Sequence, residues 1–332
     1  MRTRHRILSH SGRTSASSRR DLLTRDQRRV LAGVCIVVGA ATTVPASYNY
    51  VVAPMLEGLG ASETQGSLLR QLPSIAGLLV IFLAGTLGHR WGERRFITRC
   101  GLLFTVGNAA VAVAPGMAVA VAGLVLQSIG ASGFIVVALA LLSARVSDEE
   151  ARASAFSTYA TVGPIVYLAM PLLAGVLLDH SSWRLVAAVW ALSGLVILMA
   201  SRKCLPTAEG PRDSRELLTP ALAGVLLMAA VQTLSAADRD GLLSIGALVR
   251  LGIAVLAFAG LSWALRRAES PSLSLAALGQ GGMSLLLIIV ILMSFANLWF
   301  YMTVGLQYVP ASTPSKPRWR CCPLSRQQSS ER

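Results

Sequence analysis

The chain has 332 residues, of which 54% are hydrophobic and 14% are charged, and its mean hydropathy is +0.60. Apolar segments of about 20 residues, the length that spans a bilayer as a helix, recur along most of the chain. This composition excludes a soluble domain and predicts an all-α membrane protein in the lipid bilayer. The membrane we expect is the plasma (inner) membrane. The net charge of +14 comes largely from arginines in alternate loops, which the positive-inside rule explains without a nucleic-acid partner.

The first segment, residues 1–29, is rich in serine and carries nine arginines. A stretch this polar cannot bury an apolar core, so we predict a disordered basic tail in the cytoplasm that fixes the orientation of the first span. Two alternatives stay open at this point. Ser18 to Leu23 loosely resembles a twin-arginine signal, and the Arg/Ser bias resembles a transit peptide.

Six apolar segments follow and predict a six-helix N-terminal bundle, residues 30–201. A mixed-charge cytoplasmic linker, 202–217, then precedes two extra spans within 218–265, and 266–309 holds a ninth span. The nine spans cover approximately 30–54, 66–88, 98–114, 117–144, 154–178, 183–200, 218–235, 244–265 and 283–305. An N-terminus in the cytoplasm places the arginine-rich loops on the cytoplasmic side.

After Pro310 the composition changes abruptly to a basic tail, 310–332. Nine spans from a cytoplasmic N-terminus leave this tail outside, against the charge bias of the other loops. We therefore expect an aberrant tail produced by truncation or frameshift. The segment 266–309 would then be the first span of an incomplete second bundle, whose remaining helices are a missing partner.

The loop expected between the second and third spans, residues 85–97, carries the most specific pattern in the chain. Its glycines permit close helix approach and a tight reversal, and its arginines favour the cytoplasmic side. The glycines are Gly85, Gly88 and Gly92, and the arginines are Arg90, Arg94 and Arg95. The spacing resembles the signature loop of major facilitator superfamily transporters, in which an Asp stands where this chain has His89.

Three further segments resemble motifs of the same superfamily. Gln127 and Ser128 lie in a likeness of the fourth-span motif, with Leu124 at its Arg position, and Trp183-Arg184 matches the usual opening of the sixth span. The fifth-span antiporter motif is represented by Pro171 and Gly175, with Met170 and Ala174 in place of two glycines. Together with the two extra spans, these motifs resemble the fourteen-span drug:proton antiporter branch.

The resemblance implies that the first, second, fourth, fifth and ninth spans line a central cavity, where neutral polar side chains would meet substrate. Tyr159, Gly163 and Tyr167 share one face of the fifth span at four-residue spacing. The cavity candidates are Tyr48, Asn49, Gln71, Gln127, Ser128, Ser132, Tyr159, Tyr167, Asn297 and Tyr301. The alternative is that these groups form helix–helix hydrogen bonds instead.

No span carries an obvious proton carrier, because every Asp, Glu and His lies in a tail, a loop or a span end. The five cysteines show no metal-ligand spacing. We therefore expect no catalytic residues, no metal, no cofactor and no enzyme activity. Arg70, near the outer end of the second span, would snorkel outward or attract an anionic substrate.

Two functions follow from these patterns. The first is export of a small molecule, drug-like or a metabolite, by alternating access around a midplane site, with this chain as a fragment of a full-length transporter. His89 would weaken the cytoplasmic lock between bundles, because neutral imidazole cannot replace a fixed negative charge. The second is a membrane scaffold that does not transport or a decayed transporter remnant, which the altered motif positions favour.

Overall fold

The computed structural model describes residues 23–206, 218–240 and 245–267, together with Leu285, Ile288, Ile289 and Leu292. The described residues contain helices and no strand. The chain divides into two units, 1–273 and 274–332, and all the helices below belong to the first. Asn297, Tyr301, most of the predicted ninth span, the basic tail, the residues before Leu23 and most of the linker lie outside the described residues.

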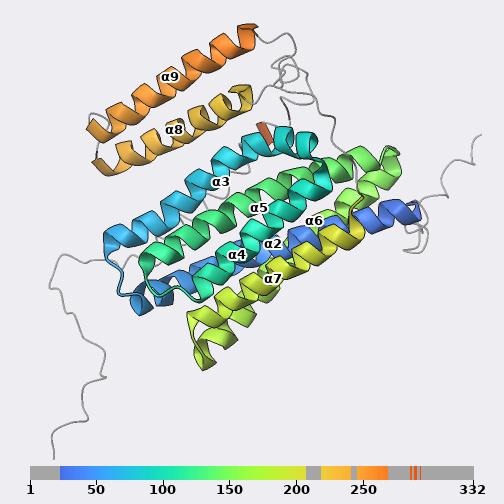
Figure 1. Cartoon of the computed structure of the whole chain (residues 1–332), viewed down its shortest axis with the longest axis horizontal. Coiled ribbons are helices and arrows are strands. Elements are labelled where there is room, and N and C mark those ends of the chain that lie inside the picture. Colours follow the sequence, from blue (N-terminus) through green and yellow to red (C-terminus); the bar gives the residue numbers. More distant parts are fainter. Residues whose placement is uncertain are drawn as a thin grey trace, which may run out of the picture. The chain divides into compact units, whose positions relative to one another are not determined.

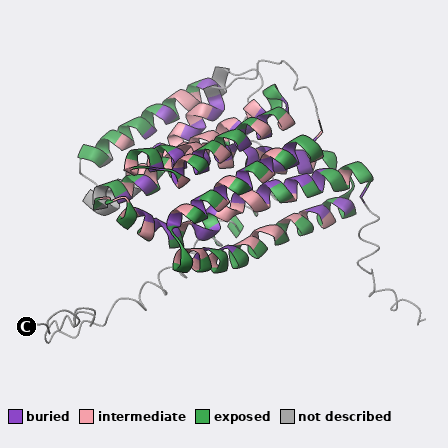
Figure 2. Ribbon diagram, turned by 60° about the horizontal axis from the view of Figure 1, so that its bottom comes forward, coloured by how far each residue is buried: buried purple, intermediate pink, exposed green. Residues whose placement is uncertain are grey.

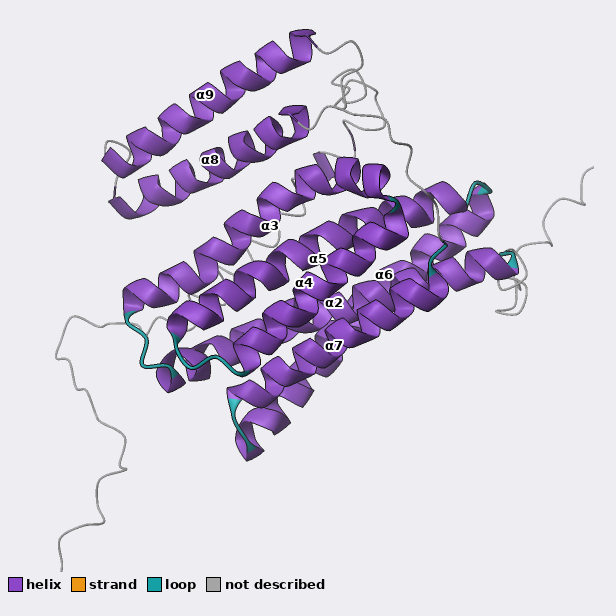
Figure 3. Ribbon diagram, in the orientation of Figure 1, coloured by secondary structure: helices purple, strands orange, loops and turns teal. Residues whose placement is uncertain are grey.

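Eight helices match the first eight predicted spans closely and confirm the all-α class (Figure 1). Their bounds are α2 (Arg25–Gly58), α3 (Glu63–Trp91), α4 (Glu93–Ala112), α5 (Met117–Arg145), α6 (Glu149–His180), α7 (Trp183–Cys204), α8 (Leu218–Asp240) and α9 (Ile245–Arg267). The connections between α2 and α7 are short (Figure 3).

Within the described residues, five helices are long and apolar enough to cross a membrane: α2, α3, α5, α6 and α7. The apolar parts of α8 and α9 are shorter, Thr219–Thr233 and Leu248–Ala264. The 20-residue α4 begins with Glu93 and carries three arginines in its first two turns. These charges leave α4 with a short apolar remainder, although neighbouring helices bury one side of it.

Local capping explains where several helices begin. Thr24 and Gln27 form a capping box at α2, in which the backbone N–H of Gln27 donates to Thr24 Oγ1 at 3.3 Å. Ser62 and Gln65 repeat this arrangement at α3. Asp148 accepts from the N–H of Ala151 at 2.9 Å at the start of α6. Each side chain satisfies a backbone donor that the first helical turn leaves unpaired.

The helices of the bundle meet through small residues and buried side chains. A Cβ added to Gly107 of α4 would lie 2.5 Å from the carbonyl oxygen of Gly123 in α5, so the two backbones can approach this closely only with glycine. The rings of Phe104 and Phe134 meet edge to face nearby, with centroids 5.6 Å apart. Buried residues gather on the faces that helices turn toward one another (Figure 2).

Helix α2 is central because it packs against α5, α6 and α7. Trp190 of α7 donates its indole N–H to Ser47 Oγ of α2 at 2.9 Å, and both side chains are fully buried. Thr43 Oγ1 lies 3.1 Å from Ser193 Oγ one turn away. This polar seam fixes the register of α2 against α7, since an unpaired indole N–H inside the bundle would be costly.

Alternate connections lie at the same end of the bundle, as expected of helices that each cross a membrane. At one end, Gln27 of α2 donates to the carbonyl of Arg145, the last residue of α5, at 3.1 Å. At the other end, Arg184 of α7 donates to the carbonyl of Ala112, the last residue of α4, at 3.3 Å. We call the end that holds the α3–α4 junction the basic end.

Candidate functional site

The predicted signature loop is a helix junction made by a single residue. Helix α3 continues to Trp91 and α4 begins at Glu93, so only Gly92 interrupts the helices. Its φ of 81° lies in the region that favours glycine. A Cβ on Gly88 would lie 2.5 Å from Val137 Cγ2 of α5, whereas one on Gly85 would meet no atom within 4 Å. The structure therefore explains two of the three predicted glycines.

The charged side chains of this junction point in different directions. His89 and Arg90 are exposed at the end of α3, as are Arg95 and Arg99 on α4. The half-buried Arg94 donates from Nη2 to the carbonyl of Arg202 at 2.7 Å. This hydrogen bond ties the α3–α4 junction to the last turn of α7. The sequence of residues 85–97 does not indicate this contact.

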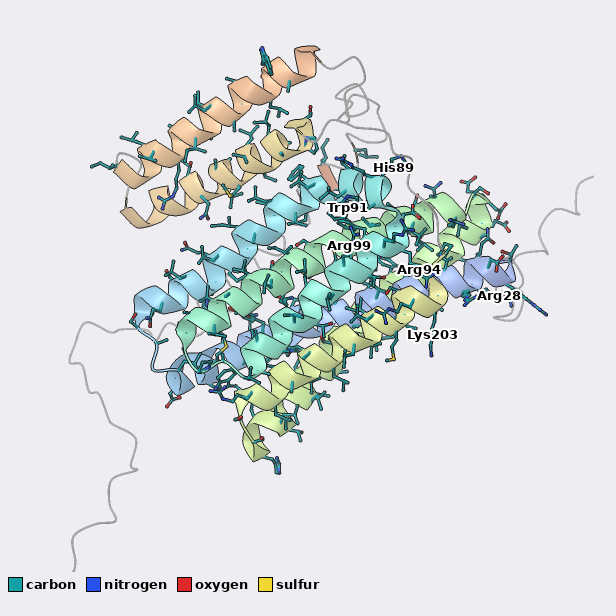
Figure 4. All side chains as sticks on the ribbon, in the orientation of Figure 1. Arg28, His89, Trp91, Arg94, Arg99 and Lys203 are labelled. Carbon is teal, nitrogen blue, oxygen red and sulfur yellow. The ribbon has the colours of Figure 1, made fainter. Side chains whose placement is uncertain are left out.

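A pocket lies beside this tie, between α4 and the end of α7. Its volume is about 360 Å³, and its lining residues are Arg94, Arg95, Thr98, Arg99 and Arg202. Figure 4 shows Trp91, Arg94, Arg99 and Lys203 gathered toward the basic end. Arg202 joins the set only through folding, because it is 103 residues from Arg99 in the chain and no local sequence signal connects them.

The Trp183-Arg184 pair performs two packing tasks at the opposite end. Trp183 is 6% exposed, and its Nε1 would lie 2.8 Å from a Cβ added to Gly58, the last residue of α2. Arg184 stacks over the Trp183 ring at 4.6 Å while it caps α4 through Ala112. The pair therefore joins the ends of α2, α4 and α7.

In the fifth-span motif, the two positions where this chain replaces a glycine face the interior of the bundle. Met170 and Ala174 are buried, and Pro171 and Gly175 between and after them are half-buried. A Cβ on Gly175 would meet no atom within 4 Å. Leu124, at the position of the fourth-span arginine, is 2% exposed in the apolar core.

Three of the predicted cavity residues sit at contacts between α3 and its neighbours. Ser128 donates to the carbonyl of Pro73 at 2.6 Å, and the hydroxyl of Tyr48 donates to the carbonyl of Leu69 at 3.4 Å. A Cβ on Gly77 would lie 2.5 Å from Ser128 Oγ and 2.7 Å from Ser132 Oγ. These hydroxyls take part in helix packing around the bend-prone Pro73, a role that the sequence offered as the alternative.

The remaining described candidates differ in exposure. Asn49 of α2 is exposed, and Tyr167 of α6 is 52% exposed. Gln71 and Tyr159 are half-buried, with the Tyr159 ring 6.4 Å from that of Phe156. Gln127 is buried beside Gly107 of α4. The structure therefore leaves Asn49 and Tyr167 as the most accessible of these polar groups, on two helices that pack together.

The described candidate residues carry amide, hydroxyl and aromatic groups. Within the described ranges, no cluster of His, Cys, Asp and Glu could hold a metal ion. The described carboxylates whose side chains are placed lie in the first or last turns of helices or just before them: Asp26, Glu57, Glu93, Asp148, Glu149, Glu150 and Asp179. The arrangement is suited to binding and positioning a molecule by hydrogen bonds and ring contacts.

Three similar proteins found by sequence comparison are all named for resistance to a compound. The chain is 27% identical over 259 residues to the multidrug resistance protein Stp of Mycobacterium tuberculosis, covering 76% of this chain and 48% of that protein. It is 28% identical over 253 residues to the tetracenomycin C resistance and export protein of Streptomyces glaucescens, covering 74% and 46%. The methyl viologen resistance protein SmvA of Salmonella typhimurium is 28% identical over 181 residues, covering 54% and 37%. The chain thus spans about half the length of the first of these curated relatives.

A solved structure of a peptide transporter, POT, in complex with sulfate shares the fold, with a TM-score of 0.50, 18% identity and coverage of 75% of this chain and 53% of that one. The family comparison matches residues 31–315, most of the sequence. This match agrees with the motifs and with the helix order of the bundle. The chain belongs to the Major Facilitator Superfamily.

Proposed function

We propose that this chain contributes the N-terminal helix bundle of a carrier that exports a small molecule across the plasma (inner) membrane. Membership in a superfamily of transporters supports transport rather than enzyme catalysis. The relatives are named for multidrug resistance, methyl viologen resistance and resistance with export, which supports efflux. The N-terminus lies in the cytoplasm in this proposal, because the basic end then obeys the positive-inside rule.

The observation that carries the proposal is that polar side chains stand exposed on α2 and α6, two helices that pack together. Few residues of α6 are buried: Ala151, Ala155, Met170 and Ala174. Asn49 and Tyr167 stand exposed on the two helices. A helix face with such groups is poorly suited to lipid, so in the working carrier a second helix bundle covers it and substrate binds between the two.

The exposed groups on this face also suggest the substrate class. An amide and a phenol can hydrogen-bond and stack, and the surrounding side chains, such as Leu168 and Leu172, are apolar. A neutral or amphipathic molecule fits these surroundings best. Alternating access would then occur by rocking of the two bundles around this midplane site.

One observation favours a second candidate, a membrane protein that does not transport. Leu124 fills the core where the resemblance implies an arginine, and exposed His89 replaces the carboxylate of the signature loop. A decayed transporter or scaffold would keep the bundle and lose the charged motif positions.

Efflux of ethidium from bacteria that lack their own multidrug pumps separates the candidates. We expect the chain by itself to leave ethidium accumulation unchanged and to lower it when co-expressed with the C-terminal half of the Stp relative. Asn49→Ala combined with Tyr167→Ala should abolish that gain. Leu192→Ala, at a 60% exposed apolar position of α7, is the matched control and should retain it. Absence of efflux with both halves present in the membrane would contradict transport and favour the second candidate.

A further inference from the structure

The pocket at the basic end combines two arginines of the signature loop, Arg94 and Arg95, with residues outside that loop. Four of its five lining residues are arginines, and the fifth is Thr98. The lining contains no carboxylate. Guanidinium groups bind phosphate oxygens in a bidentate manner, so a concave cluster of them attracts a phosphate-type anion more strongly than a flat surface would.

Contacts within the protein hold parts of the cluster in place before any ligand arrives. Arg94 is tied to the carbonyl of Arg202 at 2.7 Å, and the Arg99 guanidinium lies 4.8 Å from the centroid of the Trp91 ring. Thr98 Oγ1 lies 3.1 Å from Ser201 Oγ, which fixes α4 against α7 under the pocket. Such preorganisation lowers the entropy cost of binding.

The neighbouring charges increase the positive potential. Lys203 follows Arg202, and Arg29 of α2 donates to the carbonyl of Lys203. Glu93 is the nearest acidic residue along α4, and it is absent from the lining. The described residues that line or adjoin the pocket therefore carry more positive than negative charge, which attracts anions near the ends of α2, α4 and α7.

We propose that this pocket binds a phosphate group, and that the phosphate belongs to the headgroup of an anionic phospholipid. Trp91 is 40% exposed beside Arg99, and an aromatic ring next to a cation is typical of the bilayer interface, where lipid phosphates lie. The volume of about 360 Å³ holds a headgroup, at the lower end of small-molecule sites. A soluble phosphate would use the same chemistry.

The test uses the full chain in detergent micelles and native mass spectrometry, with phosphatidylglycerol, phosphatidylcholine and inorganic phosphate as probes. We expect phosphatidylglycerol to be retained in preference to phosphatidylcholine. Arg95→Gln with Arg99→Gln should weaken that retention about tenfold relative to a matched control, or about 1.4 kcal/mol. The control is Arg145→Gln with Arg152→Gln, which removes the same charge from exposed residues outside the pocket.

A second variant tests whether weaker retention in the double substitution could come from misfolding. Arg202→Gln removes a pocket guanidinium from a different helix while its backbone carbonyl still accepts from Arg94. It should also weaken phosphatidylglycerol retention and leave the melting temperature close to that of the unsubstituted chain. Binding of inorganic phosphate with the same sensitivity, without a preference for the lipid, would support the phosphate site and overturn the lipid assignment. The proposal would be overturned if the control variant lost phosphatidylglycerol retention to the same extent. It would also be overturned if the chain neither preferred phosphatidylglycerol to phosphatidylcholine nor bound inorganic phosphate.

This inference does not depend on the proposed export function. Lipid retention is measured without transport, and neither Asn49 nor Tyr167 lines the pocket. A chain that fails to export ethidium can therefore still confirm the phosphate site.

Discussion

The hydroxyl of Tyr48 lies 3.4 Å from the carbonyl oxygen of Leu69, the carbonyl that would accept from residue 73 in an unbroken helix. Residue 73 is Pro, which has no N–H, so α3 leaves this oxygen without its intrahelical donor. Tyr48 supplies a donor from α2, and Ser128 of α5 donates to the carbonyl of Pro73 itself at 2.6 Å. Two neighbouring helices thus support α3 where proline interrupts its ladder.

These two hydrogen bonds should differ in their contribution to stability. Ser128→Ala is expected to destabilise the bundle by about 1 kcal/mol, the usual size of an interhelical hydrogen bond in a membrane protein. Tyr48→Phe should cost less, because 3.4 Å is long for a hydroxyl donor. Unfolding in mixed micelles with increasing SDS measures both. A larger loss for Tyr48→Phe would show that its hydroxyl, not that of Ser128, is the main support of α3.

Glycine at the α4–α5 crossing should be essential for packing, unlike glycine in α6. Gly107→Ala places a methyl group 2.5 Å from a backbone carbonyl oxygen, so the helices must separate, at about 1–3 kcal/mol. Gly175→Ala meets no atom within 4 Å and should be neutral or stabilising by up to about 1 kcal/mol, since alanine favours helix. Thermal unfolding in detergent compares the two. Equal melting temperatures would contradict the close crossing of α4 and α5.

The seam between α2 and α7 predicts a cost for removing one buried hydroxyl. Ser47→Ala leaves the Trp190 indole N–H without its described acceptor at a fully buried position, which should cost about 1–3 kcal/mol. Ser74→Ala is the control, because Ser74 is exposed and bonds only to the carbonyl of Arg70 within its own helix. The same SDS titration should show little change for Ser74→Ala. A Ser47→Ala protein as stable as the control would mean that water or another group replaces the acceptor.

Orientation can be tested with single cysteines at exposed positions of opposite ends. In a chain whose native cysteines are replaced, Glu57→Cys at the end of α2 should react with a membrane-impermeant maleimide in intact cells. Arg95→Cys at the basic end should react only after the membrane is opened. The reason is the positive-inside rule, which retains the arginine-rich end in the cytoplasm. Labelling of position 95 in intact cells would reverse the topology.

The sequence by itself determined the helices and the family. Long apolar runs predict α2, α3 and α5–α9 to within a few residues, and α5 begins at Met117 as predicted and ends one residue later than predicted. This succeeds because spanning length and charge asymmetry are properties of consecutive residues. The order of short motifs along the chain also indicates the superfamily.

The junction of α3 and α4 shows the limit of this reasoning. The sequence predicted a loop over 85–97, but the structure keeps all of it helical except Gly92. Charged residues end a membrane span in a hydropathy profile, yet a helix continues through them into the aqueous layer because its backbone hydrogen bonds are unaffected. The single interruption occurs where glycine permits a φ of 81°.

Only the tertiary structure decided which polar residues pack and which stay open. Ser128 and Asn49 are both polar residues within predicted spans. Ser128 donates a hydrogen bond to the carbonyl of Pro73 in α3, whereas Asn49 is exposed. In a membrane bundle, apolar side chains cover both the lipid face and the core, so the period of hydrophobic residues does not distinguish the two. For the same reason the sequence could not unite Arg99 with Arg202: their pocket exists only because α4 packs against α7.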